Sequence, residues 1–96
     1  AMRAVMYFDV GSATLQGPQE KGLAEVIVSL SQQPRLRATI SGYHSASGTV
    51  AQNQELAKQR AFTVRDALLA AGIPESRVVL SRPQQRTVER VEHLGN

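Results

Sequence analysis

The sequence contains no cysteine and only four aromatic residues, Tyr7, Phe8, Tyr43 and Phe62. Without cysteine the chain forms no disulfide and the redox compartment is not indicated, so a periplasmic domain and a cytosolic domain both remain open. Because aromatic side chains are scarce, the core has to be built from valine, leucine, isoleucine and alanine.

Long hydrophobic runs are also absent. No apolar stretch approaches the roughly 20 residues of a membrane-spanning helix, and no segment resembles a signal peptide. The 96 residues, 42% of them hydrophobic and 20% charged, have the composition of an ordinary globular domain. A chain of this size buries somewhat over ~60% of its unfolded surface, which is enough for one small domain with a single core.

The positive charge is small and scattered. The formal net charge is +3, and the pI of about 10.0 is high because most of the basic residues are arginine, which stays protonated far above neutral pH. Arg77, Arg82, Arg86 and Arg90 gather toward the C-terminus, and we interpret them as a solvated surface. Nucleic-acid binding would require clustering on one face, so no nucleic-acid partner is expected.

A strand followed by a helix is expected in the first third of the chain. Residues Arg3–Asp9 are compact and rich in strand formers on both faces, which predicts a strand covered on both sides. Pro18 suits the first residue of a helix, because its missing N–H costs nothing there. Pro34 ends this helix, since the residue before a proline resists the helical conformation. Between the two prolines, apolar residues recur at helical spacing: Leu23, Val26, Ile27 and Leu30.

A second strand and helix follow, joined by a polar loop. Arg35–Gly42 alternates between apolar and polar residues and predicts a half-buried strand. Gly42 would let the backbone either leave the sheet sharply or approach another segment closely. The loop holds small polar residues, and a helix follows that ends at Ala71–Gly72. Loops and helix starts collect exposed donors and functional side chains, so we expect any binding site where this loop faces this helix. The loop residues are His44, Ser45, Ser47, Gly48 and Thr49.

The last part predicts two strands. Arg77–Ser81 is short and apolar, Pro83–Arg86 predicts a turn, and Thr87–Leu94 predicts a more polar edge strand. Helical spacing also fits Thr87–Leu94, so a final helix remains an alternative there. The order β-α-β-α-β-β predicts an α+β two-layer sandwich, with a mixed four-stranded sheet and both helices packed on one face.

Three segments carry a family likeness. Phe8–Leu15 fits an F-x-x-x-S-x-x-L pattern, and Glu89–Glu92 fits the end of N-R-R-V-E. Gly42–Ala61 fits G-H-T-D-x-x-G-x-x-x-x-N-x-x-L-S-x-x-R-A, with matches at Gly42, Gly48, Asn53, Leu56, Arg60 and Ala61. The chain resembles the C-terminal peptidoglycan-associating domain shared by OmpA, the lipoprotein Pal and the stator protein MotB.

The resemblance implies a function and a location. Residues 1–96 would form a single OmpA-like domain, which we expect to be excised from the C-terminal part of a longer protein. It would lie on the periplasmic side of the Gram-negative cell envelope, associated with the outer membrane or the cell wall. It would bind peptidoglycan non-covalently through the diaminopimelate residue of the stem peptide, and it would not be an enzyme.

The same resemblance assigns the site. Arg60 matches the arginine that receives the diaminopimelate carboxylate, and a guanidinium suits a carboxylate because two parallel N–H donors meet two oxygens. The family's aspartate, which receives the ammonium, is replaced by Ser45, so binding is expected to be weaker by roughly one to two orders of magnitude. We further expect the loop backbone from His44 to Gly48 to contribute donors and Asn53 to shape the loop, and Asp9 could face the site from the end of the first strand.

Alternatives remain open at this point. Arg60 could instead form a structural ion pair with Glu55 or Asp9, and Asp9 could be an ordinary turn residue. Because the acid is missing, the domain could serve protein docking or homodimerisation instead of wall binding. One histidine, His44, with His93 far along the chain and no cysteine, does not fit a known metal-ligand spacing, so neither a metal nor a cofactor is expected. Ser45 lacks the G-x-S-x-G context of a hydrolase nucleophile.

Overall fold

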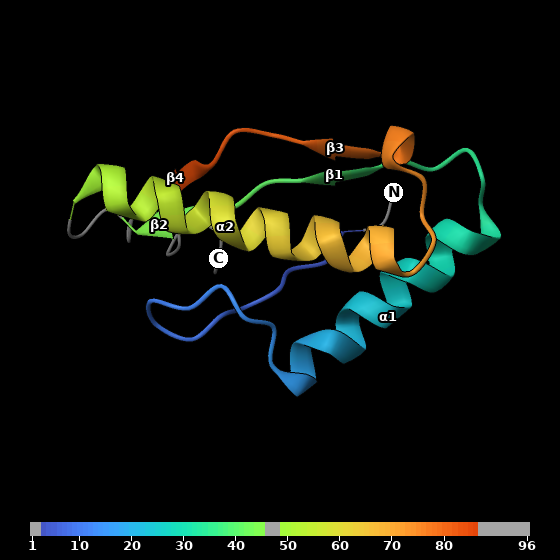
Figure 1. Ribbon diagram of the computed structural model, residues 1–96, viewed down its shortest axis with the longest axis horizontal. Helices are drawn as coiled ribbons and strands as arrows, with labels where there is room; N and C mark the ends of the chain where they lie inside the picture. Colours follow the sequence, from blue (N-terminus) through green and yellow to red (C-terminus); the bar gives the residue numbers. More distant parts are fainter. Residues whose placement is uncertain (1–2, 46–48, 87–96) are drawn as a thin grey trace, which may run out of the picture.

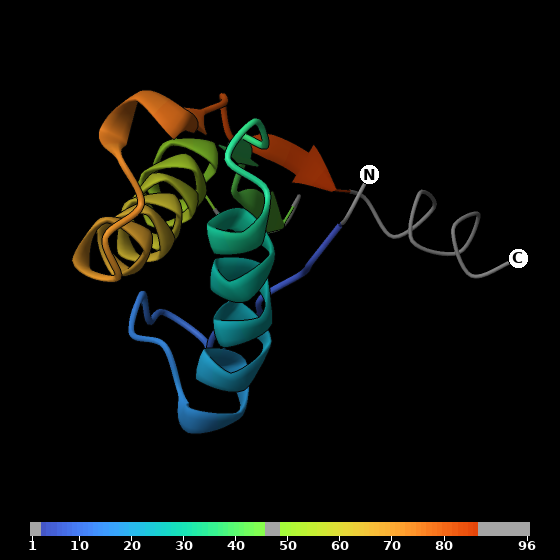
Figure 2. The same cartoon turned by 90° about the vertical axis from the view of Figure 1, so that its right-hand side faces the viewer.

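The computed structural model describes residues 3–45 and 49–86. The elements follow in the order α1 (Gly17–Gln32), β1 (Ala38–Ile40), β2 (Tyr43–Ser45), α2 (Val50–Ala70), a 3-10 turn η1 (Glu75–Arg77), β3 (Val78–Leu80) and β4 (Gln84–Arg86). Helix α2 runs along the long axis of the molecule, with β1 and β3 side by side above it in Figure 1. Figures 1 and 2 show that α1 crosses α2 obliquely rather than lying alongside it.

Two parallel ladders follow one another along the same pair of chain segments. Strand β1 pairs with β3, with Ala38 opposite Val78, and β2 pairs with β4, with Tyr43 opposite Gln84. Between the two ladders, the backbone N–H of Ser81 donates to the carbonyl of Ile40 at 2.8 Å. Parallel neighbours need a long crossover, and α2 provides it.

Helix α1 begins one residue before the predicted start at Pro18 and ends where the sequence predicts. Pro18 lies in the first turn, where Glu20 complements the positive end of the helix dipole. After the last turn, the N–H of Gln33 donates to the carbonyl of Ser29 at 3.1 Å, and Pro34 follows. The predicted helix is confirmed.

Helix α2 ends in a Schellman motif. Gly72 has φ of +94°, a left-handed conformation that glycine adopts without strain. The N–H of Ile73 donates to the carbonyl of Leu68 at 3.1 Å, and the N–H of Gly72 donates to Leu69 at 3.0 Å. Ile73 and Leu68 are both buried, which adds the hydrophobic contact typical of this motif. The predicted helix end at Ala71–Gly72 is confirmed.

The core lies between the two helices and the β1–β3 ladder. Its buried members are Leu23 and Leu30 from α1, Leu68 from α2, and Ile73. Half-buried residues of the ladder pack on them, including Ala38, Ile40 and Val78. The core is aliphatic, as the scarcity of aromatic residues predicts.

A tight contact fixes the N-terminal half of α2 on the strands. A Cβ added to Gly42 would lie 2.8 Å from the carbonyl carbon of Ala57, so the position has no room for a side chain. Ala57 and Ala61 are buried on this side of α2. The predicted close approach at Gly42 is confirmed.

Four predictions for the strands are wrong in whole or in part. Arg3–Asp9 is not a strand: the N–H of Tyr7 donates instead to the side-chain oxygen of Gln19 at 2.9 Å. Val5 and Tyr7, which would share one face of a strand, are also 44% and 68% exposed, so the segment is not covered on both sides as predicted. The strand predicted over Arg35–Gly42 is shortened to Ala38–Ile40, because the N–H of Leu36 still bonds back to Gln33 at the end of α1.

The other two corrections concern the second ladder. His44 and Ser45 were predicted in a loop, but they belong to β2. The turn predicted over Pro83–Arg86 is instead β4, whose residues 84–86 continue the parallel pairing of β3. The mixed four-stranded sheet is therefore not present in the described ranges, which hold two two-stranded parallel ladders. The predicted closing strand Thr87–Leu94 lies outside the described residues.

Candidate functional site: a turn held against helix α2

The turn at Asp9–Ser12 precedes α1 and is closed by its own backbone. The N–H of Ser12 donates to the carbonyl of Asp9 at 3.0 Å, and Gly11 has φ of +69°, which favours glycine. The N–H of Thr14 donates to the hydroxyl of Ser12 at 3.0 Å, and this bond fixes the chain that leaves the turn. The carbonyls of Asp9 and Ser12 then accept hydrogen bonds from α2.

Arg60 on α2 is the donor to both carbonyls. Its Nε–H donates to the carbonyl of Ser12 at 2.7 Å, and its Nη2 donates to the carbonyl of Asp9 at 2.9 Å. Its Cζ also lies 5.3 Å from the centroid of the Phe8 ring, within the range of a cation–π contact. The guanidinium is thus held at a fixed place and angle between the turn and the helix.

The guanidinium of Arg60 is half-buried, and no carboxylate among the described residues pairs with it. Burial lowers the pKa of Arg60, but an arginine stays protonated at neutral pH. Within the parts of the chain that the structure describes, the ion pairs are Lys58–Glu55 at 3.3 Å and Arg65–Asp66 at 3.0 Å. A partly desolvated positive charge of this kind is favourable for binding an anion.

The bonds to the turn use one edge of the guanidinium. Nε and Nη2 form its side-on edge, and this edge meets the carbonyls of Ser12 and Asp9. Nη1 has no hydrogen-bond partner among residues 3–45 and 49–86. The end-on edge, formed by Nη1 and Nη2, is therefore the part of Arg60 that could meet a ligand carboxylate in the two-bond geometry.

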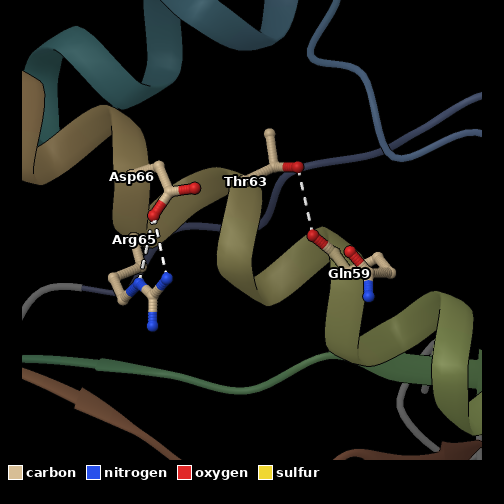
Figure 3. Close-up of polar contacts among 4 residues, drawn as sticks. All are labelled: Gln59, Thr63, Arg65 and Asp66. Atoms are coloured by element: carbon tan, nitrogen blue, oxygen red, sulfur yellow. Dashed lines mark hydrogen bonds and ion pairs between the residues drawn. The ribbon is translucent and has the colours of Figure 1, made fainter.

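Thr63 holds the same segment one helical turn further along α2. Its hydroxyl lies 2.6 Å from the carbonyl of Ala13 and 3.1 Å from the carbonyl of Gln59 in its own helix. Figure 3 shows the longer of the two contacts, from the Thr63 hydroxyl to the carbonyl of Gln59. A hydroxyl has a single hydrogen to donate, and the shorter distance favours Ala13 as its acceptor.

Comparison with known proteins identifies the family. The family model described as "OmpA family" matches residues 7–92. The chain belongs to the OmpA family. Among solved structures, the peptidoglycan-associated lipoprotein from Burkholderia pseudomallei is 28% identical, with a TM-score of 0.72 over 81% of this chain and 68% of that one. The OmpA-like domain of FopA1 from Francisella tularensis has a TM-score of 0.75 at 23% identity, over 83% of this chain and 54% of that one.

Curated relatives agree with this membership. The chain is 34% identical over 71 residues to the "Probable lipoprotein YiaD" of Escherichia coli K12, covering 74% of this chain and 32% of the relative. It is 30% identical to the "Peptidoglycan-associated lipoprotein" of Agrobacterium fabrum, covering 76% and 41%. It is also 30% identical to the "Outer membrane protein A" of Klebsiella pneumoniae, covering 80% and 23%. The chain thus spans less than half the length of these curated relatives. The predicted family and the coarse α+β fold are confirmed.

The structure brings only part of the predicted OmpA-family site into direct contact. Arg60 and Asp9 meet, but through the backbone carbonyl of Asp9. Neither ion pair considered for Arg60 is present among the described residues, because Glu55 instead bonds to Lys58 and Gln59. Whether Arg60 receives a ligand stays a prediction.

The other predicted site residues lie at the N-terminal end of α2 or on β2. Asn53 is half-buried in the first turn of α2, where its N–H donates to the carbonyl of Thr49 at 3.0 Å. It precedes Arg60 by seven residues, so both lie on one side of the helix. His44 and Ser45 are the second and third residues of β2. Their roles, like that of Asn53, stay predictions.

Sequence reasoning missed Thr63 and the carbonyl acceptors. Thr63 stands three residues after Arg60, and this spacing places both side chains on the same face of α2. That spacing was the available signal. The acceptors of Ser12 and Ala13 belong to the backbone, which a residue pattern does not reveal.

The described part of the molecule contains neither a metal-binding cluster nor a membrane-spanning helix. No group of three or more histidine, cysteine, aspartate or glutamate side chains there is arranged to hold a metal ion. Neither described helix is long and apolar enough to cross a membrane.

Proposed function

We propose that this domain associates non-covalently with peptidoglycan, and that Arg60 receives the free carboxylate of the diaminopimelate residue in the stem peptide. We further propose that the protein containing it lies in the Gram-negative envelope, at the outer membrane or the cell wall. Relatives named peptidoglycan-associated lipoprotein and outer membrane protein A support both proposals. The domain acts by binding and not by catalysis.

The observation that carries the proposal is the state of Arg60. Its charge is half-buried, it has no carboxylate partner in the described ranges, and its side-on edge is fixed by the carbonyls of Ser12 and Asp9. An incoming carboxylate would bind the end-on edge without any rearrangement of the turn. Preorganisation of this kind lowers the entropic cost of binding.

The zwitterionic end of diaminopimelate also carries an ammonium group. In our proposal the hydroxyl of Ser45 accepts a hydrogen bond from it, with backbone from the His44 region, while Asn53 shapes the loop and Asp9 faces the site. A neutral hydroxyl in place of a carboxylate forfeits an ion pair, and we expect affinity lower by about one to two orders of magnitude than with an aspartate at this position.

Co-sedimentation with purified sacculi tests the proposal. We expect the wild-type domain to pellet with the sacculi and Arg60→Ala to stay in the supernatant. Arg65→Ala is the matched control: it removes the same charge from the same helix, but Arg65 is already paired with Asp66 at 3.0 Å, so retention should be unchanged. Ser45→Asp should increase retention. A wild-type domain that stays in the supernatant, or Arg60→Ala that pellets equally, would show the proposal to be wrong.

Protein docking or homodimerisation is the alternative function. It predicts a wild-type domain that does not pellet with sacculi and whose mass in sedimentation equilibrium rises with concentration. A monomer over the whole range would count against homodimerisation.

A further inference from the structure

We propose that Thr63 is a positioning residue: its hydroxyl fixes the Ser12–Ala13 backbone, and this backbone in turn holds the Arg60 guanidinium in its binding orientation. The inference rests on the proposed function for its effect on ligand binding. The positioning itself is a property of the free domain, which can be measured separately.

The geometry shows three acceptors on one short segment facing one side of α2. The carbonyls of Asp9, Ser12 and Ala13 accept from Arg60 Nη2 at 2.9 Å, Arg60 Nε at 2.7 Å and the Thr63 hydroxyl at 2.6 Å. Arg60 and Thr63 are three residues apart on the helix and therefore neighbours on its surface. The segment is thus attached to α2 at two adjacent points.

The two attachments have different consequences. An arginine side chain is long and has many rotamers, so two bonds to a movable loop would not by themselves hold it in place. Thr63 is short, β-branched and restricted at χ1, so its hydroxyl position is set by the helix. The Ala13 carbonyl is consequently tied to a rigid element, and the neighbouring Ser12 carbonyl presents a fixed acceptor to Arg60 Nε.

The Thr63 hydroxyl has a second possible acceptor besides the carbonyl of Ala13. The Thr63 hydroxyl also lies 3.1 Å from the Gln59 carbonyl within α2 (Figure 3). A threonine in a helix commonly bonds back to its own helix, and a threonine that did only this would leave the segment attached to α2 through Arg60 alone. The contact of 2.6 Å to Ala13, shorter than the one to Gln59, indicates that the tertiary bond is preferred.

The test uses Thr63→Val, which keeps the shape and removes the hydroxyl, and Thr63→Ser, which keeps the hydroxyl. Thr39→Val is the matched control, because Thr39 is exposed on β1, away from the turn. We expect sacculus affinity to fall about threefold to tenfold in Thr63→Val, the effect of one lost hydrogen bond. Affinity should be restored in Thr63→Ser and unchanged in Thr39→Val. Equal binding by Thr63→Val and wild type, or equal loss in the Val and Ser variants, would overturn the proposal.

A second readout needs no ligand. The Arg60 Nε–H is protected by its bond to Ser12, and its exchange with water can be followed by NMR in the free domain. We expect faster exchange in Thr63→Val, with the wild-type rate in Thr63→Ser and Thr39→Val. Unchanged exchange in Thr63→Val would overturn the positioning role. If wild-type domain fails to bind sacculi while Thr63→Val still accelerates exchange, the proposed function falls and the positioning of Arg60 by Thr63 stands.

Discussion

Two arginines of this domain, Arg60 and Arg77, donate hydrogen bonds to backbone carbonyls in two different regions of the fold. Arg60 binds the carbonyls of Ser12 and Asp9. Arg77, at the end of η1, donates from Nε to the carbonyl of Leu36 at 2.9 Å and from Nη2 to those of Leu30 and Gln33 at 2.8 and 2.9 Å. Both are half-buried, and both join segments about 40 to 50 residues apart in the sequence.

The two arginines differ in whether the segment that they bind has carbonyls left without a partner by a helix end. Leu30 and Gln33 stand at the C-terminal end of α1, where the last carbonyls have no partner within the helix and the dipole is negative. Arg77 satisfies them and also ties down Leu36 in the connection to β1. The Asp9–Ser12 turn is closed by its own backbone bond, so Arg60 is not needed to complete a helix there. Arg77 therefore completes a helix end and stabilises the fold, whereas Arg60, held beside a turn that closes itself, keeps the end-on edge that we propose for a ligand.

Of the variants that test this comparison, Gly42→Ala is expected to have the largest effect on stability and binding. The new Cβ would collide with the backbone of Ala57, one helical turn before Arg60, and we expect a loss of about 3 kcal/mol in the free energy of unfolding. Displacement of α2 at this point should also weaken sacculus binding, while leaving the bonds of Arg77 to α1 intact. Urea denaturation measures the stability. Gly17→Ala is the control, because a Cβ there meets nothing within 4 Å, and equal stability of the two variants would contradict the account.

Arg77→Met should separate folding from binding. It removes three hydrogen bonds from a charged donor, and since water can reach part of this site, we expect a loss of about 2 kcal/mol in the free energy of unfolding. Sacculus binding per folded molecule should be unchanged. Arg65→Met serves as the stability control, because Arg65 is a half-buried arginine on α2 whose guanidinium bonds to the side chain of Asp66 and not to a helix end. A stable Arg77→Met domain that no longer binds sacculi would reverse the roles assigned to the two arginines.

Arg60→Lys should have the opposite effect to Arg77→Met: a small loss of stability and a clear loss of sacculus binding. Lysine keeps the charge, but one ammonium group does not reproduce the two bonds to the turn together with a two-bond contact to a carboxylate. We expect a loss of about 1 kcal/mol in stability and about a tenfold loss in sacculus affinity. Denaturation and co-sedimentation of the same preparation measure both. A large loss of stability with full binding would make Arg60 a residue that stabilises the fold, as Arg77 does.

Glu55→Gln should have the smallest effect. The pKa of Glu55 is lowered by its hydrogen bond from Gln59, and then by Lys58. Because the pKa is lower in the folded state, the stabilisation is present above the ordinary value of about 4.5 and is lost as the pH falls through the folded pKa. The small Tm difference between variant and wild type should therefore disappear in acid. Sacculus binding should not change, since Glu55 does not contact Arg60; loss of binding would contradict that assignment.

The sequence predicted the helices and the family well, because those signals are local. The stripe of Leu23, Val26, Ile27 and Leu30, the proline boundaries and the glycine at 72 each act over a few residues, and α1 and the end of α2 follow them. Strands depend on distant partners: Arg3–Asp9 has strand-forming residues but no partner strand among the described residues, and Gln84–Arg86 pairs with β2 despite a turn-like sequence.

The sequence could predict the side chains of the candidate site that belong to a motif, but not the backbone groups that hold them. The motif identified Arg60 and its helix. The acceptors that hold Arg60 are carbonyls of Ser12 and Asp9, and any residue type supplies a carbonyl. Thr63 belongs to no ligand pattern, and only the folded chain brings it to Ala13.

The most direct test of the central claim is an NMR titration of the Arg60 side chain with a stem peptide ending in diaminopimelate. The account predicts a saturable shift of the Arg60 signals that is absent when the terminal carboxylate is amidated, with Arg65 signals unchanged in both cases. An equal response to the free and amidated peptides, or no response to either, would contradict it.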